Sequence, residues 1–251
     1  ARNYNQGIQQ ARGAMVLILN NDTLAHGGSL DTLLDWMDRH PDYGMVGPRV
    51  VGVDGRVQPV CARSLMTPLR YILSLLVVDS GFVTGRLWER FRGWQVARRA
   101  SGPAPCLVGA CMLLRRSALD TCGLLDEGYD FYYEDIEWCH RFQQMGWRVG
   151  YVAEATITHL GDQSLAKVKV WAKQSEYRSA LRYFRQYYRL GPRGAWLIWL
   201  VTLLSTLLRG AAFALLEGLA GKQGHARAYF YLWAWLWREG RSETNSVKRD
   251  G

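Results

Sequence analysis

Two short apolar runs in the first half of the chain predict buried strands. The first run covers residues 15–19 and is followed by the polar segment 20–23, and the second covers residues 106–114. Short continuous apolar runs that end in turn-forming residues are typical of strands buried on both faces of a parallel sheet. Ligands of open α/β sheets bind beyond the carboxyl ends of strands, so the segment 20–23 occupies a place suited to chemistry. Further extended pieces are predicted at 147–152 and 156–159.

Segments with helical spacing alternate with these runs. Residues 3–12, 30–39 and 134–145 carry apolar side chains three and four positions apart. The alternation of the two patterns predicts an α/β domain. Residues 64–100 differ, because apolar positions give way there to interleaved basic and aromatic side chains. We expect this segment to be an insertion that is partly helical.

The C-terminal third combines basic and strongly apolar segments. Residues 167–193 contain eight basic side chains and one acid, and residues 195–208 contain no charge. As a helix, the uncharged segment is about 21 Å long, shorter than a bilayer core of about 30 Å. A second apolar stretch, 228–237, is rich in Trp and Tyr and is flanked by Arg. This pattern suits a membrane interface, and the alternative is a pair of buried helices in an appendage or a dimer interface.

The charge of the chain narrows the classes of partner. Its 31 Lys and Arg against 22 Asp and Glu give a formal net charge of +9, which favours anionic partners. The sequence has no helix-turn-helix, RNP or zinc-finger pattern, so we expect no nucleic-acid partner. Five cysteines form no CxxC pair and no paired Cys/His spacing, which argues against a zinc site or a disulfide framework and favours small core residues.

Three polar features stand at places suited to chemistry. Asp22 follows the first predicted strand, Glu134 and Asp135 open a predicted helix, and His159 lies in an extended piece. The helix dipole stabilises carboxylates at a helix N-terminus, so Asp135 can remain charged as a base or a ligand. Each feature also has a purely structural interpretation. Asp22 can be a turn residue, Glu134 and Asp135 can cap the first turn of the helix, and His159 can be a histidine whose hydrogen bonds are satisfied within the fold.

Taken together, a series of motifs resembles the family 2 glycosyltransferases of the GT-A type, especially the branch that contains bacterial rhamnosyltransferases of polysaccharide assembly. The resemblance covers roughly residues 1–190 and rests on the order and spacing of the motifs. The matching segments are NQGI at 5–8, LNNDT at 19–23, VGACMLLRR at 108–116, GLLDE at 123–127, YEDIEWCHR at 133–141, GW at 146–147, and His159 with Gly161 and Ser164.

The resemblance implies a truncated GT-A fold, a Rossmann-like mixed sheet flanked by helices, over residues 1–165 with a helical insertion at 64–100. Residues 166–240 are then a basic and apolar helical region close to a membrane, and 241–251 a flexible tail. Members of the family begin with a strand, a loop and a further acidic residue that bind the base and ribose. Those elements should precede Asn5 and are absent from this sequence. An inactive isolated chain is therefore an alternative expectation.

For the site, the resemblance implies metal-dependent transfer from a nucleotide-diphosphate sugar. Asp22 is the expected metal-binding residue of a DxD-like motif, and His159 completes the site for Mn²⁺ or Mg²⁺. Asp135 is the expected catalytic base. Gly109 and Ala110 border the donor sugar, where small side chains permit close approach. The remaining donor or acceptor contacts are expected from Glu134, Arg2, Asn5, Asn20 and Arg141.

The expected function is an inverting glycosyltransferase that moves a sugar, with rhamnose as the candidate, to a glycan or polyprenyl-linked acceptor in cell-surface polysaccharide synthesis. A divalent ion stabilises the leaving diphosphate, and one base on the opposite side implies single displacement with inversion. The expected location is the cytoplasmic face of the bacterial inner membrane, against an anionic membrane surface. The alternative is a truncated, noncatalytic module of the same fold that binds nucleotide sugar or glycan.

Overall fold

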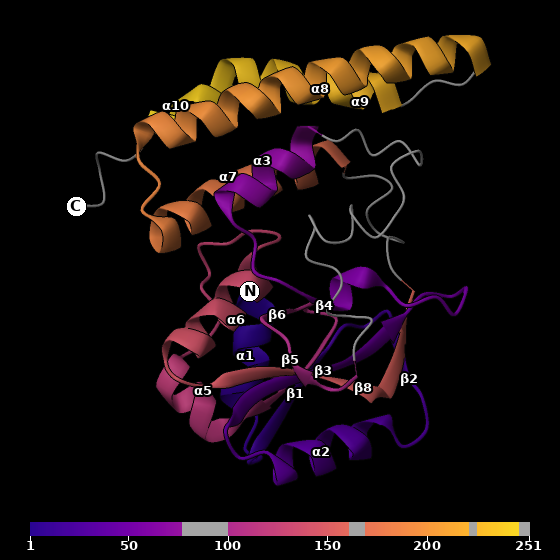
Figure 1. Ribbon diagram of the computed structural model, residues 1–251, viewed down its shortest axis with the longest axis vertical. Coiled ribbons are helices and arrows are strands. Elements are labelled where there is room, and N and C mark those ends of the chain that lie inside the picture. The colour runs from indigo at the N-terminus through magenta and orange to yellow at the C-terminus, as the bar shows by residue number, and fades with distance from the viewer. Residues whose placement is uncertain (77–99, 161–168, 221–224, 246–251) are drawn as a thin grey trace. The chain divides into compact units, whose positions relative to one another are not determined.

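The computed structural model describes residues 1–76, 100–160, 169–220 and 225–245 (Figure 1). The described residues form two compact units. The first contains those of Ala1–Met66 and Gly85–Gln163, and the second contains those of Thr67–Thr84 and Ser164–Gly251. All side chains to which the sequence analysis assigned chemistry belong to the first unit.

A six-stranded sheet forms the centre of the first unit. Its strands are β1 (Met15–Leu19), β2 (Thr23–Ala25), β3 (Tyr43–Val51), β5 (Gly102–Pro103), β7 (Cys111–Arg115) and β8 (Arg148–His159). They run in the order β1-β7-β3-β8-β2, and β5 pairs with β8. β3 and β8 are parallel, whereas the other pairs are antiparallel. The predicted mixed sheet is confirmed.

The prediction of a strand buried on both faces is wrong for β1. This strand lies at the edge of the described sheet and pairs antiparallel with β7. Val16 and Ile18 are buried, while Leu17 and Leu19 alternate with them and are 37% and 39% exposed. Such alternation is the pattern of a strand that is covered on one face. The apolar run identified a strand correctly but did not reveal its position in the sheet.

A turn divides the second apolar run. Cys106–Leu107 forms β6, which leaves the main sheet and pairs with β4 (Ala62–Arg63), so β7 begins only at Cys111. Conversely, the two extended pieces predicted at 147–152 and 156–159 are one strand, β8. Its pairing with β3 contains an irregularity between Val152 and Thr156. The five cysteines of the chain are all buried and unbonded.

Four described α-helices of the first unit accompany this sheet, and all but α5 lie close to the places predicted in the sequence analysis. They are α1 (Arg2–Gln10), α2 (Ser29–Arg39), α5 (Arg116–Cys122) and α6 (Glu134–Gln144). Helical spacing predicts one apolar face from Ile136, Cys139, Phe142 and Met145; α6 buries the first three, whereas Met145 follows the end of the helix and is 57% exposed. Trp138 meets Phe142 edge to face with ring centroids 5.6 Å apart. Burial of each large apolar side chain contributes about 1.5–3 kcal/mol. These side chains anchor α6, and with it the first turn that carries Glu134 and Asp135.

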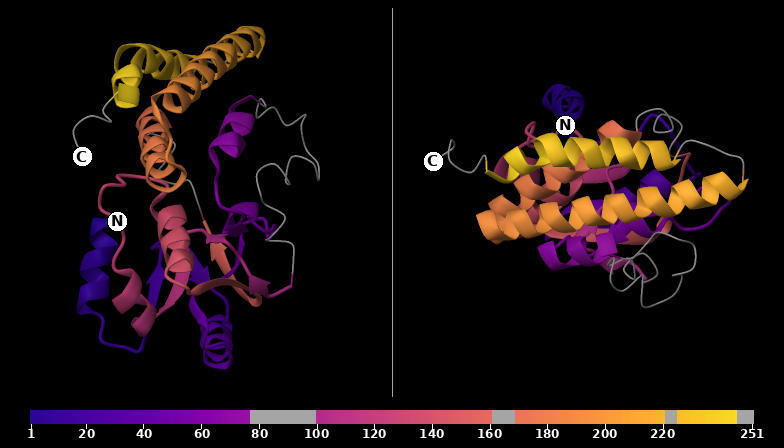
Figure 2. Two further views of the ribbon diagram at one scale, coloured as in Figure 1. Left: turned by 60° about the vertical axis from the view of Figure 1, so that its left-hand side comes forward. Right: turned by 90° about the horizontal axis from the view of Figure 1, so that it is seen from above.

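The second unit is helical. Its elements are α3 (Pro68–Leu76), α7 (Lys169–Tyr188), α8 (Pro192–Ala220), α9 (His225–Trp235), the π-helical turn η4 (Leu236–Gly240) and α10 (Arg241–Asn245). α8 and α9 lie side by side (Figure 2). The hydroxyl of Ser205 on α8 donates to the carbonyl of Leu75 at 2.6 Å, and Arg209 donates to the carbonyls of Ser74 and Leu75. These bonds satisfy carbonyls at the C-terminus of α3.

Two boundaries differ from those expected. Part of the predicted insertion at 64–100 is helical, as α3, and α3 groups with the C-terminal helices; residues 77–99 lie outside the described part. Residues 241–245, the first part of the expected tail, form α10. Arg178 on α7 pairs with Glu243 at 3.0 Å, and this contact holds the last described turn in place.

α8 is the most apolar helix that the structure describes. Its segment Pro192–Gly218 is long enough to cross a membrane and contains an 18-residue window with a mean hydropathy of 1.8, although 39% of that window is buried within the protein. Leu197, Leu204, Leu208 and Leu215 are all exposed. Their spacing of seven, four and seven residues places them on one face of the helix. We call these four residues the leucine stripe.

Candidate functional site

A cleft of about 740 Å³ opens in the first unit where three distant segments meet. The beginning of α1, the segment that follows β1 and a loop before α6 form its walls. The lining residues are Ala1, Arg2, Asn3, Tyr4, Leu19, Asn20, Asn21, Asp22, Glu127, Tyr129 and Asp130. The cleft therefore lies beyond the carboxyl end of β1, as predicted for the segment 20–23. It is a polar space with the size of a small-ligand site.

Asp22 and His159 lie together although they are far apart in the sequence. β2 and β8 pair antiparallel with Thr23 opposite His159, and the amide of Leu160 donates to the carbonyl of Asp22 at 2.9 Å. This register brings Nε2 of His159 within 3.3 Å of Oδ1 of Asp22. Gln58 makes two contacts with His159, one between its Oε1 and Nδ1 at 3.2 Å and one from its Nε2 to the backbone carbonyl at 3.1 Å.

This pair fits a divalent cation. When Nδ1 of His159 donates to Gln58, the lone pair of Nε2 is free to face a metal, and such support of the second ring nitrogen is typical of metal-binding histidines. A separation of 3.3 Å between a carboxylate oxygen and an imidazole nitrogen suits two neighbouring ligands of one ion. No group of three or more His, Cys, Asp or Glu suited to a metal occurs among the described residues. The remaining ligands would be oxygens of a bound anion or water.

The backbone that precedes Glu134 and Asp135 is strained. Tyr132 and Tyr133 have φ values of 61° and 69°, in the left-handed region that bulky residues avoid. Each costs on the order of 1–3 kcal/mol, and such strain is concentrated at functional sites. The turn ends where α6 begins, so the two carboxyls enter the positive end of the helix dipole.

The carboxylate of Asp135 is held by three groups. The amide of Ile136 donates to its Oδ1 at 2.8 Å, and the amide of Gly109 donates to its Oδ2 at 3.3 Å. Nη2 of Arg63 lies 3.6 Å from the same Oδ2. The side chain of Asp135 is 13% exposed, so it retains limited access to solvent. Gly109 therefore lies beside the expected base.

The neighbouring Glu134 lies in surroundings that favour the neutral form of its carboxyl group. Its burial, followed by the negative charge of Asp135, raises the pKa of Glu134 to about 7. Burial also raises the pKa of Tyr4, with further contributions from the charges of Glu134, Asp22 and Asp135. Tyr4 lines the cleft and donates to Oδ1 of Asn20. The three expected acidic residues are thus arranged around one phenol at the wall of the cleft.

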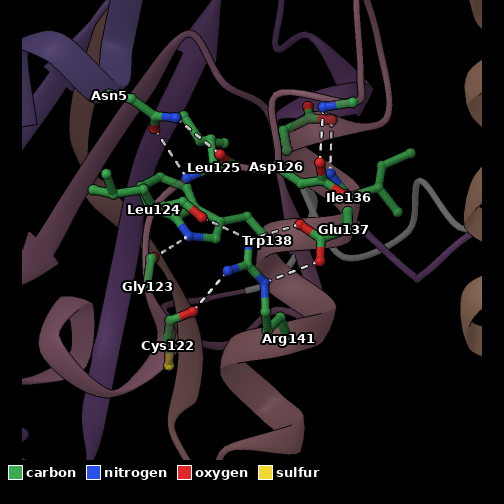
Figure 3. A network of polar contacts seen from close by, with 12 residues as sticks. Asn5, Cys122, Gly123, Leu124, Leu125, Asp126, Ile136, Glu137, Trp138 and Arg141 are labelled. Atoms are coloured by element: carbon green, nitrogen blue, oxygen red, sulfur yellow. Dashed lines mark hydrogen bonds and ion pairs between the residues drawn. The ribbon is translucent and has the colours of Figure 1, made fainter. Parts of the chain in front are cut away.

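The structure gives other places to some of the expected contact residues. Asn5 is buried; its amide donates to the carbonyl of Leu125 at 2.9 Å and its oxygen accepts from the same residue's amide at 3.0 Å. Arg141 donates to Glu137 at 2.9 Å through both Nε and Nη2, and also to the carbonyls of Cys122 and Leu124 (Figure 3). Both of these expected binding residues therefore hold the backbone of the loop before α6.

Ala110 is 1% exposed, and its carbonyl accepts the amide of Asn20 at 2.9 Å. Arg2 does line the cleft and pairs with Glu127 at 3.2 Å. Sequence reasoning missed Tyr4, Gln58 and Arg63. A signal existed only for Tyr4, which shares a face of α1 with the buried Ile8 four residues later. Nothing in their sequence context marked the other two.

The comparisons with known proteins agree with one another on the family. Residues 1–176 match the model of the glycosyltransferase-like family 2. The chain is 34% identical over 150 residues to N-acetylglucosaminyl-diphospho-decaprenol L-rhamnosyltransferase of Mycobacterium tuberculosis. The aligned part covers 57% of the chain and 46% of that protein. It is 26% identical over 204 residues to the O-antigen biosynthesis protein RfbC of Myxococcus xanthus, covering 76% of the chain and 14% of that protein. The chain thus matches about half or less of the length of these relatives.

Solved structures with a similar arrangement include GalNAc-T7 with UDP, GalNAc and Mn²⁺, at 14% identity and a TM-score of 0.49, covering 77% of the chain and 37% of that protein. Another is the mannosyltransferase PcManGT of Pyrobaculum calidifontis with GDP-Man and Mn²⁺, at 15% identity and a TM-score of 0.46, covering 97% and 66%. The family model matches well over half of the chain. The protein accordingly belongs to glycosyltransferase family 2.

Proposed function

We propose that the protein is a metal-dependent, inverting glycosyltransferase that moves a sugar from a nucleotide-diphosphate donor to a lipid-linked glycan in cell-surface polysaccharide synthesis. The observation that carries the proposal is that Asp22 lines the cleft and contacts His159, while Asp22 and Asp135 both act electrostatically on Tyr4 in the wall of that cleft. Rhamnose is the proposed sugar, because the mycobacterial relative is named as a rhamnosyltransferase acting on a decaprenol-linked substrate.

Asp22 and His159 are the residues that would hold a divalent cation, with Gln58 orienting the imidazole. Bound there, Mn²⁺ or Mg²⁺ would neutralise charge on the departing diphosphate. A site with one nitrogen and one oxygen donor favours Mn²⁺ somewhat over Mg²⁺. Arg2 and Asn20 line the same cleft, where they can contact the donor.

Asp135 is the proposed base. In the transfer step, an acceptor hydroxyl oxygen forms a bond to the anomeric carbon as the bond from that carbon to the diphosphate breaks. The hydroxyl proton passes to Asp135, and the nucleoside diphosphate leaves with the bonding electron pair. One displacement from the face opposite the leaving group inverts the anomeric configuration. The neighbouring amide of Gly109 keeps the carboxylate in place.

Replacement of Asp135 by Asn in the full-length protein tests the proposal. We expect turnover of donor and acceptor to fall by at least about 10²-fold, while calorimetry still shows metal-dependent donor binding. The matched control is Asp120→Asn on the exposed surface of α5, which should keep wild-type turnover. Retained turnover in the Asp135 variant would reject the base. Donor binding without any turnover by the wild-type protein would instead favour the noncatalytic module.

Attachment to a membrane is part of the proposal. The leucine stripe on α8 lies exposed in the second unit, and basic residues stand at the ends of the apolar helices, with Arg193 in the first turn of α8 and Arg238 after α9. An apolar stripe with flanking cations fits the surface of an anionic bilayer. The cytoplasmic face of the inner membrane is the proposed location, because nucleotide sugars and a polyprenyl-linked acceptor would meet there.

A further inference from the structure

Arg63 is a largely buried cation beside the carboxyl pair at the start of α6. Its side chain is 18% exposed, and its Nη2 lies 3.6 Å from Oδ2 of Asp135. Because removing an ion from water is costly, a buried guanidinium needs a charged partner. Asp135 supplies that partner. This contact places the positive charge of Arg63 next to one specific oxygen, Oδ2, of the expected base.

The two-stranded sheet fixes this geometry. β4 and β6 pair with Arg63 opposite Cys106, and the amide of Val108 donates to the carbonyl of Cys61 at 3.3 Å. The chain continues from β6 directly to Gly109, whose amide also donates to Oδ2 of Asp135. One small rigid element therefore delivers both a cation and an amide to the same carboxylate oxygen. Side chains on ordered strands are held more accurately than side chains on loops.

Glu134 receives no comparable support. Its Oε2 is buried and has no hydrogen-bond partner among the described residues. The groups that act electrostatically on this carboxyl pair are Tyr4 from α1, Arg63 from β4, Cys106 from β6, Cys139 from α6 and the terminal ammonium of Ala1. Two adjacent carboxyls that share one nearby cation cannot both be charged without a cost, because like charges repel at short distance.

We propose that Arg63 is a positioning residue that selects Asp135, and not Glu134, as the charged base of the pair. It does so by pinning Oδ2 together with the Gly109 amide, so that the remaining carboxylate surface of Asp135 faces the acceptor. Glu134 is then the carboxyl of the pair that takes up a proton first as the pH falls. This inference rests on the proposed function, since it assumes that Asp135 accepts the acceptor proton.

The test compares Arg63→Met and Arg63→Lys in the full-length protein. For Arg63→Met we expect kcat to fall by about 10²-fold, the loss typical of a misplaced catalytic group, with a much smaller change in the KM for the donor. The acid limb of the kcat/KM profile should move to higher pH, because no cation then favours the carboxylate. Arg63→Lys should retain more of kcat than Arg63→Met does, since it keeps the charge.

A structural comparator separates positioning from folding. Arg115 is partly buried and donates to the backbone carbonyls of Met37, His40 and Tyr43. Arg115→Met should lower the melting temperature without moving the acid limb. If Arg63→Met keeps the kcat and the acid limb of the wild type while Asp135→Asn is inactive, the role of Arg63 is overturned and the proposed function is not. Retained turnover in Asp135→Asn would overturn the proposed function itself, so the two failures are distinguishable.

Discussion

Nε2 of His159 faces Oδ1 of Asp22 at 3.3 Å, and the contact follows from how two strands are paired. Because β2 and β8 are antiparallel with Thr23 opposite His159, the residue just before β2 reaches the last residue of β8. Gln58, from the segment between β3 and β4, then contacts both the ring and the backbone of His159. Three separate segments thus prepare one pair of donor atoms.

Loss of the Asp22 carboxylate should weaken Mn²⁺-dependent binding of a nucleoside diphosphate. Asp22→Ala removes one of the two proposed protein ligands, and calorimetric titration with Mn²⁺ in the presence of nucleoside diphosphate measures the effect. Asp31→Ala, on the exposed side of α2, is the control. An unchanged Mn²⁺ titration in Asp22→Ala would count against this ligand.

Gln58→Leu should reduce Mn²⁺ affinity by about 10–100-fold, although Gln58 is not a ligand, because groups that orient a metal-binding histidine have effects of this size. The change leaves Asp22 and His159 in the sequence and removes only the contacts that Gln58 makes with His159. The same calorimetric titration measures it. If affinity in Gln58→Leu equals that of the wild type, the imidazole does not depend on this support.

The stability of the protein should fall between about pH 4.5 and pH 7 on account of Glu134. Burial raises the pKa of this carboxyl to about 7 in the folded state, above the usual value near 4.3 of a Glu in an unfolded chain. The folded state therefore binds more protons in this window, so the free energy of unfolding decreases as pH rises, by up to about 3 kcal/mol.

Glu134→Gln removes this titration. We expect the variant to show a flatter pH dependence and to exceed the wild type in unfolding free energy above pH 7, as measured by urea denaturation at pH 5 and pH 8. Parallel curves for the two proteins would show that Glu134 does not titrate in this range. Turnover provides a second comparison, in which Asp135→Asn should lose more activity than Glu134→Gln.

Arg141 should matter for stability. Glu137 is 1% exposed and forms its ion pair with Arg141, so Arg141→Met should cost about 3–5 kcal/mol by breaking a buried pair. Urea denaturation gives the value. Arg148→Met is the control, because Arg148 and Asp42 are each 51% exposed and such pairs contribute about 1 kcal/mol or less. The double variant Glu137→Leu/Arg141→Met should recover part of the loss, and equal losses in both single arginine variants would contradict the assignment.

The leucine stripe should bind lipid. Leu204→Gln combined with Leu208→Gln should lower partitioning onto vesicles that contain anionic lipid by about tenfold or more, because each Leu buries apolar area in the membrane. Flotation of full-length protein with such vesicles is the measurement. Leu24→Gln, at an exposed leucine in the first unit, is the matched control. Equal flotation of the two variants would remove the stripe from the interface.

Two glycines allow a test of how α8 meets the membrane. A Cβ added at Gly191 or Gly218 meets nothing within 4 Å, and all native cysteines are buried, so Gly191→Cys and Gly218→Cys introduce accessible thiols near the two ends of α8. A helix that lies in the interface places both thiols on the same side. An impermeant thiol reagent should then label both only in inverted membrane vesicles. Labelling from opposite sides would show a spanning helix.

Much of the secondary structure is encoded locally. The apolar face of α6, the strand at 15–19 and the polar segment after it were recognisable because periodicity and turn chemistry act over a few residues. The resemblance of the motifs also pointed to Asp22, Asp135 and His159 as members of a single site. Arg141 and Asn5 belonged to the same motifs, yet the structure assigns them to the loop before α6. Membership of a motif does not separate side chains that bind ligand from those that support them.

The resemblance of the motifs was sufficient to predict the family, and the residue patterns were sufficient to predict most of the main elements and their order. The folded chain was needed to show that β1 lies at an edge, that Gln58 supports His159, and that Arg63 and Gly109 reach the same oxygen of Asp135. Those relationships depend on strand register. A register is set by packing across the whole sheet, and no local pattern of residues carries it.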